Sequence, residues 1–217
     1  MFMWALQSYR HAAQRLRPTG RLKRMLLCVC VVVLSGLLHV PAYAIDVHPT
    51  AQQIQTALAQ GKEAAQKGRS PDSFYVRFGV ADEVQPQGFL ITKIGALSVM
   101  ATHMALRGLQ PSEVNVTQVL EDNTMLISAV IFGDTTNFAV DSYLVLNQEG
   151  KTIKPVMVRF DGRANRSVVW PKSPRFKAKV VASFNYADFD PKAKTSITVY
   201  PGIGGEWSFS LDFSEIH

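Results

Sequence analysis

The sequence predicts an α+β protein in which N-terminal helices are followed by an antiparallel β-sandwich. Before Pro111, apolar residues recur at the three- and four-residue spacing of a helix, and after it apolar and polar residues alternate as in strands with one buried face. Gly, Pro, Asn and Asp separate the alternating segments, as turn residues do. Six or seven short strands at this spacing are compatible with an immunoglobulin-like arrangement.

Residues 1–44 have the three parts of a signal peptide. Six cations precede the apolar run 25–38, and residues 42–44 (Ala-Tyr-Ala) form an A-x-A cleavage motif. The apolar run is shorter than the ~20 residues that a membrane-spanning helix needs. We therefore expect cleavage after Ala44, with an uncleaved anchor as the alternative, no membrane span in the remaining chain, and a periplasmic or secreted location.

The basic charge of the chain belongs to residues 1–44. The whole sequence has 23 Lys and Arg against 17 Asp and Glu, but six of the cations and none of the acids lie before residue 45. Residues 45–217 are therefore neutral overall, which argues against nucleic-acid binding. Cys28 and Cys30 also lie before residue 45, so the remainder has no disulfide, no cysteine metal ligand and no cysteine nucleophile.

The chain divides into three expected parts. They are a signal peptide at 1–44, an N-terminal helix and linker at 45–72, and a single globular domain at 73–217. Thr50 is the expected cap of the first helix and Gly68 its stop. The narrow apolar stripe of this helix is expected to pack lightly, and it consists of Ala51, Ile54, Leu58, Gly61 and Ala65.

The globular domain is expected to contain a helix at about 93–108 and a C-terminal β-sandwich at about 113–217. The helix carries no charge between Lys93 and Arg107, ends at Gly108 and is too short to cross a bilayer. We expect it to cover one face or end of the sheet. Its inward residues are expected to be Ile94, Leu97, Ala101 and Met104.

Strand patterns follow one another through the domain. Short strands are expected at 74–78 and 89–91, ahead of the sandwich. Gly202–Gly205 superficially resemble a phosphate-binding loop, but no helix is expected after them, so a hairpin turn is the better interpretation. The strand patterns of the sandwich lie at 124–132, 138–146, 176–186, 197–199 and 207–213.

The sequence assigns no catalytic residue. It has no HExxH, GxSxG, Walker or GxGxxG pattern. His48 and His217 lie near the ends of residues 45–217, and His103 is expected at the edge of a packed helix. Asp188 and Asp190 form a D-x-D spacing in a segment typical of a solvated turn. We expect no metal and no cofactor, and we favour a binding protein over the alternative, a periplasmic hydrolase or metal-dependent enzyme.

Charge is segregated along residues 45–217. Between Arg107 and Lys151 there are six acids and no cation, whereas residues 151–179 carry nine cations and one acid. Acidic strands paired with basic strands across the sheet are the structural explanation. The functional explanation is a candidate site for an anionic partner, which comprises Arg163, Arg166, Trp170, Lys172, Arg175, Lys177 and Lys179.

These observations indicate an exported, non-catalytic binding or assembly module of the cell envelope. Its basic face would meet an anionic cell-envelope polymer or an acidic protein. A complementary acidic patch on a second copy of the chain would also allow self-association.

Overall fold

A computed structural model describes residues 45–216, so the predicted signal peptide lies outside the described residues. The described residues confirm the α+β fold class, with three α-helices and two antiparallel sheets. None of these helices is long and apolar enough to cross a membrane. The helices are α2 (Ala51–Gln66), α3 (Lys93–Ala105) and α4 (Glu113–Glu121), with short 3₁₀ helices η1 (Pro71–Phe74), η2 (Tyr186–Asp188) and η3 (Phe213–Glu215).

The strands of the described residues form two sheets in which neighbours are antiparallel. The first sheet has the order β1-β2-β3-β8-β6, with β7 also paired to β8, and the second has the order β10-β9-β4-β5. The first sheet is built from β1 (Val76–Gly79), β2 (Gln87–Ile91), β3 (Thr124–Gly133), β6 (Met157–Phe160), β7 (Asn165–Arg166) and β8 (Phe176–Asn185). The second is built from β4 (Tyr143–Gln148), β5 (Lys151–Ile153), β9 (Lys194–Tyr200) and β10 (Trp207–Asp212).

The apolar core lies between the two sheets. In the long pair β3–β8, Ile127 is the register partner of Ala182, and both are fully buried. Leu144 of β4 and Ile197 of β9 belong to the same buried cluster, so the two sheets pack face to face. The largest fully buried side chains include three aromatic residues, Phe138, Phe184 and Phe213.

Most of the predicted elements are confirmed, including the helix at 93–108, which forms α3 and ends in a turn at Gly108. The patterns at 124–132, 176–186, 197–199 and 207–213 correspond to β3, β8, β9 and β10. The residues around Gly202–Gly205 connect β9 to β10, which pair antiparallel, as the hairpin interpretation required.

Two segments after Pro111 differ from the expected alternation. The first, at 113–121, forms helix α4, because Ser112 and Asn115 make a reciprocal capping box that starts a helix. The second, at 138–142, forms turns, in which the Ser142 amide donates to the Ala139 carbonyl over 3.1 Å. The strand β4 therefore begins only at Tyr143.

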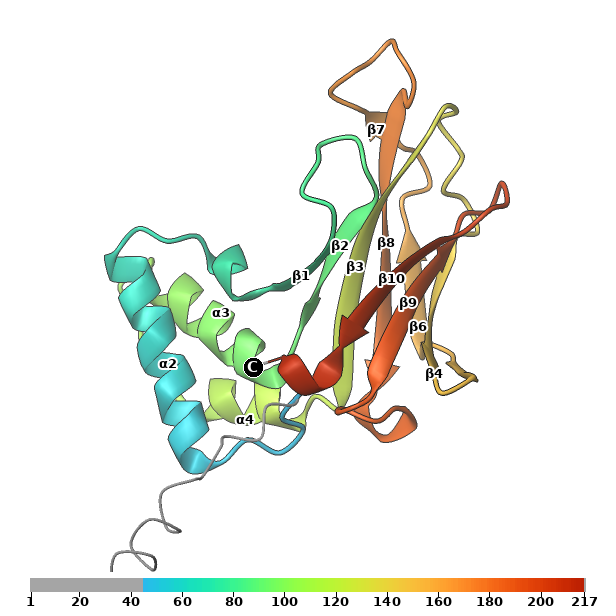
Figure 1. The fold of residues 1–217 in the computed structure, drawn as a ribbon. Coiled ribbons are helices and arrows are strands. Elements are labelled where there is room, and N and C mark those ends of the chain that lie inside the picture. The colour runs from blue at the N-terminus through green and yellow to red at the C-terminus, as the bar shows by residue number, and fades with distance from the viewer. Residues whose placement is uncertain (1–44, 217) are drawn as a thin grey trace, which may run out of the picture. The chain divides into compact units, whose positions relative to one another are not determined.

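Helix α2 packs closely against α3 through small residues. A Cβ added at Gly61 would lie 2.3 Å from the backbone oxygen of Ser98 and 2.7 Å from the Cβ of Ala101. The Ser98 hydroxyl donates to the carbonyl of Ala57 over 3.1 Å, and the Thr102 hydroxyl lies 3.1 Å from the carbonyl of Gly61. Figure 1 shows α3 between α2 and the strands of the first sheet.

The expected apolar stripe of α2 is only partly buried: Gly61 is buried, Ile54, Leu58 and Ala65 are half-buried, and Ala51 is exposed. The buried residues of α2 are Ala57, Gly61 and Ala64. Ile54 and Leu58 are only partly buried, because the helices approach along the face with the smallest side chains. The larger side chains of α2 are therefore left beside the contact with α3 and do not fill it. On α3, two of the four expected inward residues are buried, Leu97 and Ala101.

Candidate functional site

Most of the predicted basic site falls on β7, β8 and the loop that connects them (residues 167–175), and Arg163 lies just before β7. Figure 1 shows this loop, in orange, projecting beyond the strands. Ser167 holds the two ends of the loop together: its amide donates to the Arg175 carbonyl over 2.8 Å and its hydroxyl donates to the Pro174 carbonyl. The Trp170 amide donates in turn to the Ser167 carbonyl over 3.3 Å. These bonds to backbone carbonyls close the loop into a hydrogen-bonded turn.

Asp134 ties the end of β3 to this loop. One of its carboxylate oxygens accepts from the Arg175 amide over 3.0 Å, and the other accepts from the Ser173 hydroxyl over 2.9 Å. These two hydrogen bonds, that of the amide first, lower the pKa of the Asp134 carboxyl. The Nε atom of Arg175 lies 3.5 Å from the same carboxylate. At this place, therefore, the acidic and basic segments of the sequence form an ion pair.

Arg166 and Trp170 form an exposed pair on the loop. The guanidinium carbon of Arg166 lies 4.2 Å from the centroid of the Trp170 ring, which is a cation–π distance. Trp170 is 44% exposed and Arg166 is exposed. A tryptophan and an arginine therefore face solvent together, where a partner can reach both.

The strand register separates the predicted site residues into two groups. Asn165 is the partner of Lys177 and Arg166 is the partner of Phe176, so Lys177 and Arg166 point to opposite faces of the hairpin. Lys179, two residues beyond Lys177, shares the face of Lys177.

The other predicted residues lie outside these two groups. Arg163 and Lys172 are exposed, and Arg175 is held by Asp134. Of the seven predicted residues, Arg175 is the one that forms an ion pair within residues 45–216.

The lysine face borders a small hollow of mixed charge. Lys177 and Lys179 line a hollow of about 280 Å³ together with Val168 of the loop. Two acids, Glu83 and Asp161, line it as well, and Asp161 accepts from the Lys179 amide over 2.9 Å. The hollow therefore offers both signs of charge, and its surface is not uniformly basic.

The candidate catalytic and metal-binding residues are not gathered into one place. His103 and His48 are exposed, and no hydrogen bond between His103 and a carboxylate occurs in the described part. Asp188 accepts from the Asn185 side chain over 3.1 Å and Asp190 accepts from the Lys192 amide over 2.8 Å, as in an ordinary turn. Residues 45–216 contain no cluster of three or more His, Cys, Asp or Glu that could hold a metal ion, and His217 lies outside the described residues.

One surface feature was not expected from the sequence: a groove of about 850 Å³ between α2, the end of α3 and α4. Ile54 and Leu58 of α2 line it, together with Leu109 and Val116. The spacing of Ile54 and Leu58 had indicated a narrow apolar stripe, and helical periodicity alone does not say whether such a stripe faces the core or a groove.

Comparisons with known proteins find only a weak structural likeness. No protein-family model matches the chain, and no curated protein matches its sequence. The chain is similar to the archaellum periplasmic stator protein FlaG from Sulfolobus acidocaldarius, with a TM-score of 0.29 and 11% sequence identity, covering 42% of this chain and 88% of that chain. It is also similar to the archaellum periplasmic stator protein complex FlaF and FlaG from the same organism, with a TM-score of 0.25 and 13% identity, covering 41% of this chain and 77% of that chain. At these TM-scores the likeness carries no argument about function.

Proposed function

We propose that this protein is an exported, non-catalytic binding or assembly module, and that the β7–β8 loop binds an acidic surface of a partner protein. The observation that carries the proposal is the exposed Arg166–Trp170 pair on a loop fixed by hydrogen bonds. Arginine and tryptophan are enriched among the residues that dominate protein–protein binding energy. Because the loop is already ordered, less conformational entropy is lost when a partner binds.

The charges around the loop favour a folded acidic partner over a uniform polyanion. Arg163, Arg166 and Lys172 are exposed cations, but Asp134 and Asp161 lie among the basic residues. A polymer with one charge repeated along its length would meet these acids as well as the cations. A folded surface can place its own charges to complement both signs. Export itself rests on the signal-like pattern of residues 1–44.

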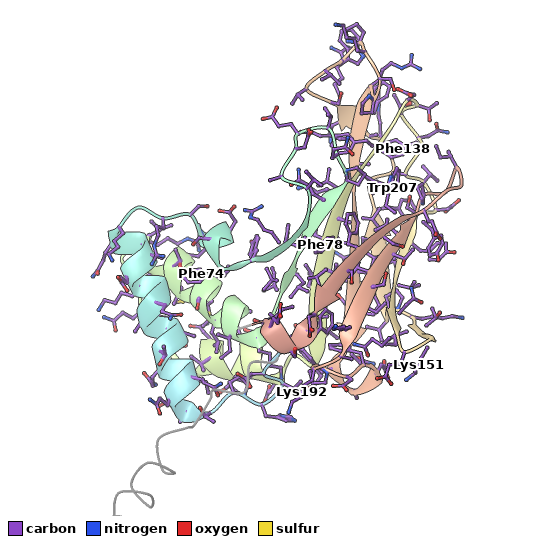
Figure 2. The ribbon with its side chains drawn as sticks, viewed as in Figure 1. Phe74, Phe78, Phe138, Lys151, Lys192 and Trp207 are labelled. Carbon is purple, nitrogen blue, oxygen red and sulfur yellow. The ribbon has the colours of Figure 1, made fainter. Side chains whose placement is uncertain are left out.

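The test compares two charge-neutralising triple variants. The first, the loop variant, replaces three exposed cations in or beside the loop: Arg163→Gln, Arg166→Gln and Lys172→Gln. The matched control removes three exposed cations elsewhere: Lys151→Gln, Lys154→Gln and Lys192→Gln. Figure 2 shows Lys151 and Lys192 at the end of the sandwich opposite to the loop.

The probe is a small folded three-helix bundle that carries Glu and Tyr on one exposed face, and heparin of matched charge is the second arm. We expect binding of the bundle that shifts the Trp170 indole resonance, weakens by at least about tenfold in the loop variant and changes by less than about twofold in the control. Equal losses in both variants would show that only net charge matters. Tighter binding of heparin than of the bundle would favour a polymer, and dimerisation that the loop variant abolishes would identify a second copy as the partner.

A further inference from the structure

A second cavity lies between the helices and the first sheet. It has a volume of about 490 Å³, which is within the range of small-molecule sites. Ile91 and Leu126 line it from β2 and β3, and Ala96, Met100 and Val119 line it from α3 and α4. Its wall is therefore largely apolar, and it is separate from the β7–β8 loop.

Lys93 places a buried ammonium at this cavity. It is the first residue of α3, it is 4% exposed, and it lines the cavity. Its Nζ atom donates to the carbonyl of Leu120, in the last turn of α4, over 2.6 Å. An ammonium has three donors, and no ion pair of residues 45–216 includes Lys93. A buried cation that is in no ion pair favours a ligand that supplies a negative charge.

Tyr186 lines the same cavity and carries a second, buried donor. It is 5% exposed, and its ring centroid lies 5.5 Å from the Lys93 Nζ atom. Its hydroxyl has no acceptor among the described residues, and the backbone amide of Lys93 is directed at it. Burial raises the pKa of this hydroxyl, so it remains protonated and able to donate. Buried hydroxyls are usually hydrogen-bonded, because an unpaired one costs free energy. A ligand that supplies an acceptor to this hydroxyl would therefore be favoured.

Of the other polar groups at the cavity, Thr92, Asn115, Asp122 and Thr124 already have hydrogen-bond partners, and Gln118 is exposed. Thr92 caps α3 by accepting from the Gly95 amide over 3.1 Å. Asp122 supplies the acidic group of the cavity wall; it is exposed, and one carboxylate oxygen accepts from the Thr124 amide (2.9 Å) and hydroxyl (2.7 Å). Water screens the exposed charge of Asp122 more effectively than the buried charge of Lys93. The interior of the cavity therefore favours an anion.

We propose that this cavity binds a small apolar molecule with a single carboxylate head, such as a medium-chain fatty acid. The carboxylate accepts from the Lys93 ammonium and the Tyr186 hydroxyl, and the apolar body lies against Ile91, Met100 and Leu126. This site is independent of the proposed acidic-partner surface, so either can exist without the other.

The test is an NMR titration of the purified full chain with ¹³C-labelled methyl groups. The probes are octanoate, acetate as the head without the tail, and 1-octanol as the tail without the charge. Octanoate is expected to shift the methyl resonances of Ile91, Met100 and Leu126. Acetate and 1-octanol should bind at least about tenfold more weakly, because each lacks one half of the interaction.

Three variants separate the proposal from non-specific uptake. Tyr186→Phe removes only a hydroxyl that has no acceptor in the described part, and it should lower octanoate affinity about tenfold, as should Lys93→Met. The matched control is Lys62→Met, which removes an exposed cation from the groove on the other side of the helices and should leave the affinity unchanged.

Two results would overturn the proposal. One is the absence of shifts at the three methyl groups up to about 10 mM octanoate, because a specific site of this kind would have a dissociation constant below that concentration. The other is equal affinity of the wild type and Tyr186→Phe. Because Lys93→Met also removes the hydrogen bond between α3 and α4, the Tyr186→Phe result decides.

Discussion

The α2–α3 helix pair and the β-sandwich achieve close packing in opposite ways. Between the helices, Gly61 lets the two backbones approach, and the hydroxyls of Ser98 and Thr102 reach carbonyls of α2. Between the sheets, large apolar side chains such as Phe184 and Ile127 fill the space. The helix pair should therefore be sensitive to added atoms and the sandwich to removed atoms.

The difference also explains where each region offers binding surfaces. Because α2 uses its small residues to meet α3, Ile54 and Leu58 remain available to line a groove. In the sandwich, the strands turn their large apolar residues inward, and function is left to the loops and the outer faces. The β7–β8 loop, with Arg166 and Trp170 exposed, is such a place.

The largest expected effect comes from removing a sandwich side chain. Phe184→Ala deletes a fully buried ring from β8 and should lower the free energy of unfolding by about 3–5 kcal/mol. Urea denaturation would measure it, with far-UV circular dichroism for the helices and tryptophan fluorescence for the sandwich. Val168→Ala, which truncates a side chain that is 56% exposed, is the control and should change stability by less than about 0.5 kcal/mol.

The two spectroscopic signals also test whether the two regions are one cooperative unit. Coincident transitions for both signals are expected, because residues 45–216 belong to one compact unit in which the Nζ atom of Lys93 in α3 lies 5.5 Å from the ring centroid of Tyr186, a member of the sandwich core. If Phe184→Ala shifted the fluorescence transition and left the helical transition in place, the two regions would unfold separately. The contrast in packing between the helix pair and the sandwich would then apply to two regions that unfold independently.

A smaller loss should follow from adding one methyl group to the helix pair. Gly61→Ala places a Cβ against the backbone of α3, which can move only if the helices separate. The gain in helix propensity, about 1 kcal/mol, opposes this strain, and we expect a net destabilisation of about 1–3 kcal/mol. Thr56→Ala, on the exposed side of α2, is the control and should not destabilise the protein. A Gly61→Ala protein more stable than the wild type would show that the helix contact adapts without cost.

The sandwich could be predicted from the sequence because each strand alternates between two different environments. The run 176–186 places Ala178, Val180 and Ala182 on one face and Lys177 and Lys179 on the other, and this pattern has a single sensible interpretation. The turns at 138–142 were missed because buried residues such as Phe138 can also alternate outside a strand.

The helical region was harder to predict because periodicity locates an apolar stripe but does not say what covers it. In α2 the closest contact uses Ala57, Gly61 and Ala64, whose small side chains give a weak apolar signal. Helix α4 depends on a capping box at Ser112, which a search for alternation overlooks.

The candidate sites depend on contacts that sequence spacing does not reveal. The basic residues could be listed from the sequence, but their division between two faces required the register of β7 against β8. Nothing in the chain connects Lys93 with Tyr186, which are far apart in sequence and meet only because α3 follows β2 and η2 follows β8. Pairings of this kind come from the topology of the sheet.

The smallest expected effect tests the hydroxyl groups of the helix contact. Thr102 is fully buried, and its hydroxyl lies 3.1 Å from the Gly61 carbonyl of α2 and 2.7 Å from the Ser98 carbonyl of its own helix. Thr102→Val keeps the shape and removes the donor, so it should lower the free energy of unfolding in urea by about 0.5–1.5 kcal/mol. Thr117→Val, at an exposed position of α4, makes the same chemical change and should be nearly neutral. An equal effect in both variants would mean that the Thr102 hydroxyl contributes nothing to the contact between the two helices.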